Sequence, residues 1–467
     1  MPGAGGPPLS PFSVSLPSLK IRPGSRFFES SSGGPVLLLG DTAWELFHRA
    51  DRSEVSVYLR NRSEKQFNLV LACLVPELDG VHTPNRLGQR PFLNGEPLTP
   101  DRDYFDFVRS CVAEAAALGL RFGLLPTWGD KVNNDWGIGP RIFNEDNARA
   151  YGLFLGRNFS EFAPIWVLGG DRNPRAQDIP IWNAMAAGLR EGSADTALIT
   201  YHPNGKFSSS QWFHDAPWLS FNSLQSSHYE KHYPNHQMIE ADWLREPRKP
   251  VLDLEPCYED HVVRVWDLEY GPLSPDHPYP DSLLYPLAKD GIFDECDVRQ
   301  AAYWSVLAGA AGFVYGHNSI WMMWQPGIMP AAPVRRDWKS ALDAPGANNM
   351  TLFRRFFERG GFQGLVPDQS LLLTGRERGH DHVRAARTND NTCILAYIPQ
   401  GRPETLLLDS LVGDRHSSRW FNPKTGDVVS GETWNRMRER RFVPPRKGRS
   451  WDWVLILEPA GTTVWTT

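Results

Sequence analysis

Eight short apolar runs recur along the first two thirds of this chain, and each is followed by polar or aromatic residues and a longer, mixed stretch. They are VLLL (36–39), FNLVLACL (67–74), RFGLLP (121–126), PIWVLG (164–169), ALITY (197–201), LSFNSLQ (219–225), PVLDLE (250–255) and AGFVYG (311–316). Such runs are typical of strands that are buried on both faces. Two intervening stretches, 103–118 and 144–159, space their apolar residues as amphipathic helices do, with Asn144 as a candidate N-cap.

Repeated strand–helix units in one direction predict an α/β fold, a (β/α)8 TIM barrel. An open doubly wound sheet is the alternative, but no G-x-G-x-x-G or P-loop sequence follows the first run. After residue 360 short apolar segments separated by turn residues predict a small antiparallel β-sandwich, with strands at 370–373, 382–387, 392–398, 404–408, 419–426 and 451–459. We expect a lead-in over 1–35 with short strands at 12–16 and 26–29, a catalytic barrel over 36–358 and the sandwich over 362–467.

Composition narrows the class of function. Of 467 residues, 41% are hydrophobic and 22% charged, which is typical of a globular protein with a large core. A net charge of −5 offers no basic surface for nucleic acid, and no apolar run approaches the roughly 20 residues of a membrane span. Five cysteines without a CxxC pair indicate neither a disulfide framework nor a zinc site. The N-terminus shows no signal-peptide pattern, so we expect a cytoplasmic protein, or a secreted one if a signal has been removed.

Tryptophan is over-represented, with 18 residues. The flat C–H faces of sugar rings stack on indole rings, so this excess is compatible with carbohydrate binding, although core packing accounts for most tryptophans in proteins. We expect core packing for Trp420, Trp451 and Trp453 of the sandwich. Trp451 and Trp453 would share one face of a strand beside an apolar run.

The residues that follow the apolar runs should gather at one rim, because active sites of TIM barrels lie at the C-terminal ends of the strands. Asp171 ends the fourth run after Gly169 and Gly170, and Glu255 ends the seventh. The two are candidates for the carboxylate pair of a glycosidase, although either acid alone could simply pair with a rim arginine such as Arg172. Candidate sugar-binding residues follow the runs in the same way: Asp41, Trp44, Trp128, Asp130, Lys131, His202, Gln225, His228, Tyr258, His317 and Trp321.

Other chemistries have less support. Histidines are frequent, but no HExxH or His-x-His pair has the spacing of metal ligands, so no metal site is predicted. His228, His232 and His236 recur at every fourth position, yet Pro234 among them interrupts a regular helix, and we expect a loop. No G-x-S-x-G sequence marks a serine hydrolase.

Several motifs together resemble the apiosidase-like glycoside hydrolases over roughly residues 10–355. These motifs are GDTAWELFHR (40–49), PELDG (76–80), PNRLGQRPF (84–92), LLPTWGDKVN (124–133), WVLGGDRN (166–173), ITYHP (199–203), LDLEPCYED (252–260) and RQAAYWSVLAGAAGFVYGHNSIW (299–321). The region after the barrel resembles the small β-sandwich that accompanies this family and is labelled collagen-binding. The resemblance implies a (β/α)8 barrel, a terminal apiofuranosyl or similar furanosyl linkage as substrate, and Asp171 and Glu255 as the catalytic pair. Many barrel glycosidases carry Asn-Glu on the fourth strand; the shorter Asp171 leaves retention or inversion of the anomeric centre open.

The predicted function is therefore a glycoside hydrolase that cleaves a terminal, apiosyl-like furanosyl linkage of plant cell-wall or related glycans. Asp171 would be the general acid/base, and Glu255 the nucleophile, or the base of an inverting enzyme. The partner would be an oligo- or polysaccharide, and no cofactor is needed. Two alternatives remain: the same mechanism on another sugar such as arabinofuranose, or a non-catalytic carbohydrate-binding barrel, which would need neither carboxylate.

Overall fold

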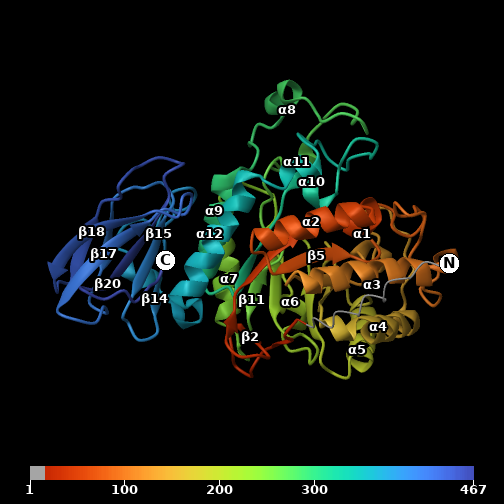
Figure 1. The fold of residues 1–467 in the computed structure, drawn as a ribbon, viewed down its shortest axis with the longest axis horizontal. Helices are drawn as coiled ribbons and strands as arrows, with labels where there is room; N and C mark the ends of the chain where they lie inside the picture. Colours follow the sequence, from red (N-terminus) through yellow and green to blue (C-terminus); the bar gives the residue numbers. More distant parts are fainter. Residues whose placement is uncertain (1–15) are drawn as a thin grey trace, which may run out of the picture.

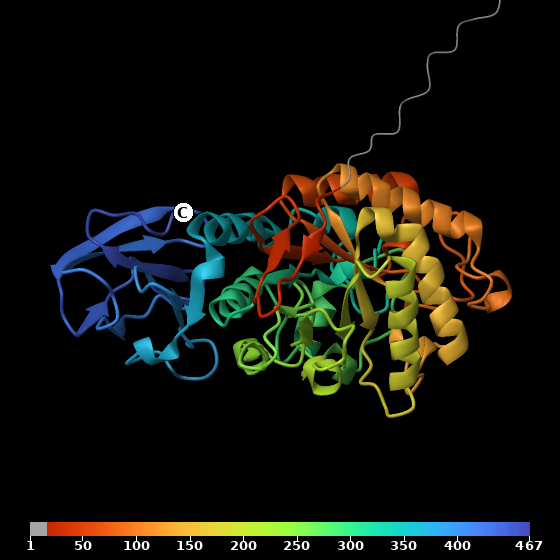
Figure 2. The same cartoon turned by 90° about the horizontal axis from the view of Figure 1, so that it is seen from below.

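The predicted (β/α)8 barrel is present in the computed structural model, which describes residues 16–467 (Figures 1 and 2). Its eight parallel strands lie within a few residues of the apolar runs. They are β4 (Leu38–Thr42), β5 (Leu69–Cys73), β6 (Arg121–Leu125), β7 (Ile165–Gly169), β8 (Leu198–His202), β10 (Asn222–Gln225), β11 (Val251–Asp253) and β12 (Gly312–Tyr315). Most of their residues are buried, as expected for strands covered on both faces.

The strands follow one another around the barrel in sequence order. Six of them form a ladder in the order β12-β4-β5-β6-β7-β8, and β10 pairs with β11 in a second ladder that β9 (Phe207–Ser208) extends. Backbone hydrogen bonds join the two ladders on both sides: Ser220 N–H donates to Ile199 O (2.8 Å), and Ala311 N–H donates to Val251 O (2.9 Å). All eight carboxyl ends therefore open at one rim.

Helices surround the strands. The two predicted from periodicity are α3 (Arg102–Ala117) and α4 (Glu145–Phe159), and Asn144 caps α4 by accepting a hydrogen bond from the Asn147 backbone N–H. The others in the barrel region are α1 (Leu46–Arg49), α2 (Arg52–Glu64), α5 (Ile179–Gly192), α6 (Ser210–Phe213), α7 (Asn235–Trp243), α9 (Glu295–Leu307), α10 (Asn318–Trp321), α11 (Trp338–Ala341) and α12 (Pro345–Gly360). No helix among residues 16–467 combines the length and apolar character that a membrane crossing requires.

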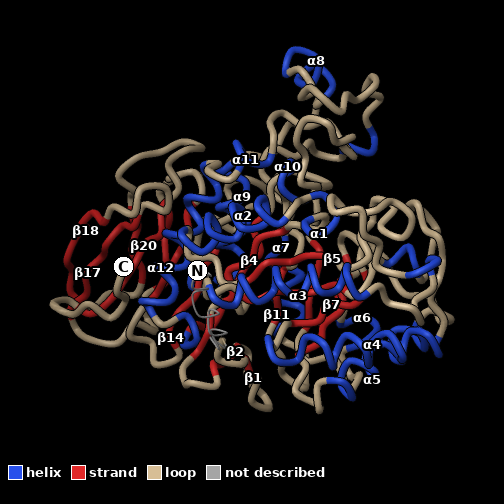
Figure 3. The backbone as a smooth tube through the Cα atoms, turned by 45° about the vertical axis from the view of Figure 1, so that its right-hand side comes forward, coloured by secondary structure: helices blue, strands red, loops and turns tan. Residues whose placement is uncertain are grey.

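The long connection between β11 and α9 rises from the barrel and carries α8 (Asp281–Leu287) at its tip (Figures 1 and 3). It leaves the strand end that precedes Glu255. A single turn of 3₁₀ helix, Val265–Asp267, lies in the first half of this connection.

Before the barrel, β1 (Leu19–Lys20), β2 (Phe28–Ser30) and β3 (Pro35–Val36) form a small antiparallel sheet. β2 overlaps the strand expected at 26–29, whereas the one expected at 12–16 lies almost entirely outside the described residues.

The C-terminal strands form a six-stranded antiparallel sheet and a two-stranded one. The first has the order β13 (Leu365–Pro367), β14 (Arg384–Thr388), β15 (Ile394–Ile398), β20 (Trp453–Pro459), β17 (Arg415–Phe421) and β18 (Val428–Asn435); the second pairs β16 (Glu404–Leu407) with β19 (Glu439–Phe442). The strand expected at 370–373 is wrong: Gln369–Leu371 is a turn of 3₁₀ helix, which Asp368 caps through the Ser370 N–H. An apolar triplet this short does not distinguish a strand from a buried turn.

The sandwich packs one face of its large sheet on α9 and α12. Tyr397 stacks on Tyr303 of α9 (4.9 Å between ring centroids), and Phe421 stacks on Phe356 of α12 (4.5 Å). Both pairs belong to the apolar cluster that also contains the barrel core. The opposite face of the sheet forms its own core, which contains Trp420 and Trp453; Trp451 lies half-buried at its edge.

Candidate active site

Asp171 follows β7 at a turn that few sequences could adopt. Gly169, Gly170 and Asp171 all have left-handed backbone conformations (φ 85°, 113° and 53°), which are strained for residues with a side chain. A Cβ on Gly169 would lie 2.3 Å from the His202 carbonyl oxygen, and one on Gly170 would lie 2.9 Å from the Gly129 nitrogen. Both glycines are therefore needed to aim the Asp171 side chain across the rim.

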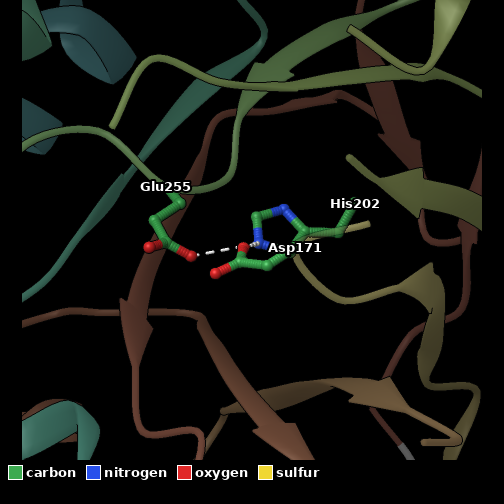
Figure 4. Close-up of side chains that lie close together, drawn as sticks. All are labelled: Asp171, His202 and Glu255. Atoms are coloured by element: carbon green, nitrogen blue, oxygen red, sulfur yellow. Dashed lines mark hydrogen bonds and ion pairs between the residues drawn. The ribbon is translucent and has the colours of Figure 1, made fainter. Parts of the chain in front are cut away.

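Glu255 lies just beyond β11 and meets two histidines. His202, the last residue of β8, places Nε2 at 3.0 Å from Glu255 Oε2 and at 3.2 Å from Asp171 Oδ1. His228 places Nε2 at 3.3 Å from Glu255 Oε1. One oxygen of each carboxylate and the imidazole nitrogen all lie within 4.8 Å of one another (Figure 4). The structure thus brings together the two acids that the sequence places 84 positions apart (171 to 255).

The surroundings of the two carboxylates shift their pKa values in opposite directions. Burial and then the negative charge of Glu255 raise the pKa of Asp171 above its ordinary value. Burial also opposes ionisation of Glu255, but its hydrogen bonds with His202 and His228 outweigh this and lower its pKa to about 2. In His202 burial favours the neutral ring, yet its contacts with the two acids raise its pKa to about 9. At neutral pH the site therefore holds a glutamate anion, an imidazolium and an aspartate with increased affinity for its proton.

Aromatic residues surround this group. The rings of Trp44 and Trp128 lie 5.5 Å and 6.2 Å from the His202 ring, and the Tyr258 ring lies 4.5 Å from that of His228. All are almost fully buried. These rings, which are expected to bind substrate, pack against the two histidines that contact the carboxylates. Gln225 ends β10, which lies between β8 and β11 in the barrel. The Gln225 Oε1 atom has no hydrogen-bond partner.

Asp41 is not part of this group. It lies on β4, but its carboxylate faces helix α2, where it accepts hydrogen bonds from Tyr58 Oη (2.6 Å) and Arg62 Nε (2.7 Å). All three side chains are buried. The expectation that Asp41 binds sugar hydroxyls is therefore wrong, because both its partners come from the layer between strand and helix.

Asp130 and Lys131 also have structural roles, because they form a fully buried ion pair (2.8 Å) and Asp130 accepts a hydrogen bond from the Gly139 N–H. His317 accepts from the Ser319 N–H at the start of α10 and faces Asp260 at 3.4 Å. All three side chains are buried, and their contact with substrate stays a prediction.

Trp321 is half-buried and packs with Trp44 and Trp128 on one side and with the apolar cluster of Met322 and Trp324 on the other. It joins the rim of the barrel to the β12–α12 connection and supports the buried indoles.

Arg172 does not neutralise Asp171, although it is the next residue. Its guanidinium donates to the carbonyl oxygens of Asn133 (3.0 Å) and Trp136, and it lies 3.4 Å from the centre of the Trp136 ring. Asp171 therefore forms no ion pair with Arg172, which would have been the simplest structural role for this acid.

Glu77 is a third carboxylate near the centre, and it follows the second apolar run, as the residues of the rim do. Burial and then the negative charge of Asp171 raise the pKa of Glu77 well above its ordinary value. Its position in PELDG after β5 was the only signal for it in the sequence.

Asp171, His202 and Glu255 are also the one group of potential metal ligands found in the part of the chain that the structure describes. The shared Nε2 of His202 is however already engaged with both acids at 3.0 and 3.2 Å. A protonated imidazole has no lone pair for a metal ion, so the group fits proton chemistry better than metal binding.

Comparison with known proteins agrees with this geometry. The family model "Apiosidase-like, catalytic domain" matches residues 22–363, close to three quarters of the chain. This chain belongs to the apiosidase-like family. Residues 366–458 match a second model, "Putative collagen-binding domain of a collagenase".

Two solved structures resemble nearly the whole apiosidase-like chain. One, described as a glycoside hydrolase, is 27% identical, with a TM-score of 0.82 over 97% of this chain and 99% of the other. Another, a glycoside hydrolase family 5 protein from Bacteroides vulgatus, is 28% identical, with a TM-score of 0.84 over 98% and 96%. A β-L-arabinopyranosidase from Geobacillus stearothermophilus shares only the fold (10% identity, TM-score 0.55, 91% and 97% coverage). Curated protein sequences gave no match. The protein is a glycoside hydrolase whose substrate is a saccharide.

Proposed function

We propose that this apiosidase-like enzyme is a retaining glycosidase in which Asp171 is the general acid/base and Glu255 the nucleophile. One observation carries the proposal: the half-buried carboxylate of Asp171 and the buried one of Glu255 lie within 4.8 Å, are joined by His202, and have pKa values displaced in opposite directions. Paired groups whose surroundings separate their pKa values divide into an acid and a base or nucleophile.

The reaction would proceed in two displacements. A Glu255 oxygen forms a bond to the anomeric carbon while the glycosidic C–O bond breaks, and the Asp171 proton passes to the departing oxygen. Water then attacks the anomeric carbon, gives a proton to Asp171 and releases Glu255. His202 holds the ionised Glu255 in place before and after each displacement.

The short distance between the carboxylates supports retention. Retaining enzymes separate their two carboxyl groups by about 5–5.5 Å, whereas inverting enzymes need about 6.5–9.5 Å to admit a water molecule. Following the first-formed product by ¹H NMR should show the anomer of the substrate. Initial release of the opposite anomer would contradict the retaining course and make Glu255 a base.

For the substrate we propose a terminal furanosyl, apiosyl-like linkage of plant cell-wall or related glycans, which is supported by the apiosidase-like family match. A panel of nitrophenyl furanosides and pyranosides, including an apioside and an arabinofuranoside, tests this choice. The apioside should be cleaved fastest. Faster cleavage of a pyranoside or of the arabinofuranoside would replace the proposed sugar and leave the mechanism unaffected.

The catalytic pair is tested by Asp171→Asn and Glu255→Gln, which keep size and remove the charge. Each should lower kcat by about 1,000-fold or more without changing the melting temperature much. Asp79→Asn is the matched control, because Asp79 also follows β5 at the rim but pairs with the exposed His82. Activity within tenfold of wild type in either catalytic variant would refute the assignment.

A further inference from the structure

All 18 tryptophans lie in the described part of the chain, and two of them are exposed: Trp136 (43% exposed) and Trp266 (51%). Exposing an indole ring forgoes the stabilisation that burial of its apolar surface would supply. Trp and Tyr are enriched where proteins contact ligands and partners, so an exposed indole is a candidate contact. The position of these two rings relative to the carboxylates decides what they bind.

Trp136 lies in the loop that follows β6 and is fixed to the residue after Asp171. Arg172 stacks on its ring at 3.4 Å and donates to its carbonyl oxygen. The neighbouring Asp135 pairs with Arg175 (3.0 Å), which ties the same loop to the β7–α5 connection. The ring is thus held rigidly while its surface remains open to solvent.

Trp266 lies in the β11–α9 connection and packs edge to face on Tyr229 (4.8 Å, 63°). Tyr229 directly follows His228, which contacts Glu255, and burial together with the negative charge of Asp171 raises the Tyr229 pKa. Lys206 lies over the other part of the Tyr229 ring at 4.1 Å. A cavity of about 390 Å³ opens beside these residues, between Lys206, Tyr229 and Arg264.

The loops that carry the two rings leave strands on opposite sides of the barrel. In the closed order of eight strands, β6 and β11 are four positions apart, which is half of the circumference. Asp171 is attached to β7, next to β6, and Glu255 to β11 itself. The loops that carry Trp136 and Trp266 therefore begin at strands beside those that hold Asp171 and Glu255.

We propose that Trp136 and Trp266 are sugar-stacking subsites on either side of the cleavage point, and that this enzyme binds an extended glycan chain. The inference rests on the proposed role of the carboxylate pair. Arg172 stacks on the Trp136 ring, and Lys206 lies over Tyr229, the ring on which Trp266 packs. Each indole is therefore a single platform with a charged group nearby, which fits individual sugar rings better than a continuous apolar partner. Each platform would contact a sugar that flanks the cleaved linkage.

Affinity electrophoresis in native gels that contain a soluble polysaccharide tests this inference without requiring cleavage. Arabinan, galactan, xyloglucan and pectin are the probes. The wild type should be retarded by at least one of them, and Trp136→Ala and Trp266→Ala should each bind it about tenfold more weakly. Trp451→Ala is the matched control, since Trp451 is half-buried in the sandwich beneath Arg446 and should leave retardation unchanged. Melting temperatures establish that each variant is folded.

Two results would overturn the inference: wild-type mobility unaffected by every polysaccharide, or both tryptophan variants retarded like the wild type. Glu255→Gln should remain retarded but inactive. Retarded wild type with a fully active Glu255→Gln would refute the catalytic assignment and leave the two subsites in place.

Discussion

At the residue scale, His202 explains how two acids in one site acquire different roles. Its Nε2 lies between Asp171 and Glu255, but only Glu255 has a second histidine, His228, on its other oxygen. The asymmetry favours the anion at Glu255, and the pKa of Asp171 is raised by burial and by that negative charge. The two acids differ because their neighbours differ.

The pH profile of the enzyme should reveal this arrangement. Activity needs Glu255 ionised and Asp171 protonated, so kcat/KM should rise with pH through the Glu255 pKa, about 2, and fall as pH passes the raised pKa of Asp171. His202→Gln removes the positive charge beside Glu255. The Glu255 pKa should then rise, and the acidic limb of kcat/KM should move to higher pH.

His82→Gln is the control for this measurement, because His82 is an exposed rim histidine that contacts only Asp79 among the acids. It should leave both limbs in place. An acidic limb that stays fixed in a folded His202→Gln variant would mean that His202 does not set the ionisation of Glu255.

The sequence predicted the acids better than the residues around them. Asp171 and Glu255 could be identified because each directly follows a strand, and the carboxyl ends of parallel strands meet at one rim. This inference does not depend on which face of the strand each residue points to. Asp41 could not be placed, because β4 is buried on both faces and its pattern does not tell the barrel side from the helix side. The exposed Trp136 and Trp266 follow no apolar run directly, so nothing in the sequence separated them from the buried indoles.

At the element scale, the turn after β7 carries the geometry of the site. Gly169 contributes both a left-handed conformation and room for the backbone of β8, since a Cβ there would meet the His202 carbonyl. The GGD sequence indicated a sharp turn, but its contact with the next strand was visible only in the structure. The eight strands and the N-cap at Asn144 were predicted because period and capping are local signals.

Gly169→Ala should therefore damage both stability and catalysis. We expect a loss of about 3 kcal/mol in the free energy of unfolding, from backbone strain and the displaced His202, and a fall in kcat of at least about tenfold. Gly24→Ala is the matched control, because Gly24 has a similar left-handed conformation (φ 76°) with nothing within 4 Å of the added carbon. It should cost only about 1 kcal/mol and leave kcat unchanged. Equal losses in the two variants, measured by denaturant unfolding, would show that crowding at Gly169 is unimportant.

At the scale of the whole molecule, barrel and sandwich share one apolar core. Tyr303 and Phe356 of the barrel helices stack on Tyr397 and Phe421, and the interface also contains a buried ion pair, Arg299 with Asp452 (2.7 Å). Without Asp452, the positive charge of Arg299 would remain unpaired within an apolar interface, which is destabilising. The sandwich is thus part of the folded unit.

Deletion of residues 362–467 should accordingly yield insoluble protein. The cut would expose the stacked rings of α9 and α12 and leave Arg299 unpaired. Expression of the shortened and full chains side by side, followed by measurement of the soluble fraction, checks this. Co-expression of 362–467 as a separate chain should restore solubility. A soluble, active barrel that had lost only its affinity for insoluble polysaccharide would instead make the sandwich a carbohydrate-binding module.

The uneven exposure of the 18 tryptophans also gives the enzyme a built-in optical signal. Indoles that are shielded from water emit at shorter wavelengths than wetted ones and are inaccessible to ionic quenchers. Iodide should therefore quench mainly the long-wavelength emission of Trp136 and Trp266, and Trp136→Phe with Trp266→Phe should abolish most of that quenchable fraction. A polysaccharide that occupies the barrel mouth should protect the same fraction, so saturation could be read from the unlabelled enzyme in solution.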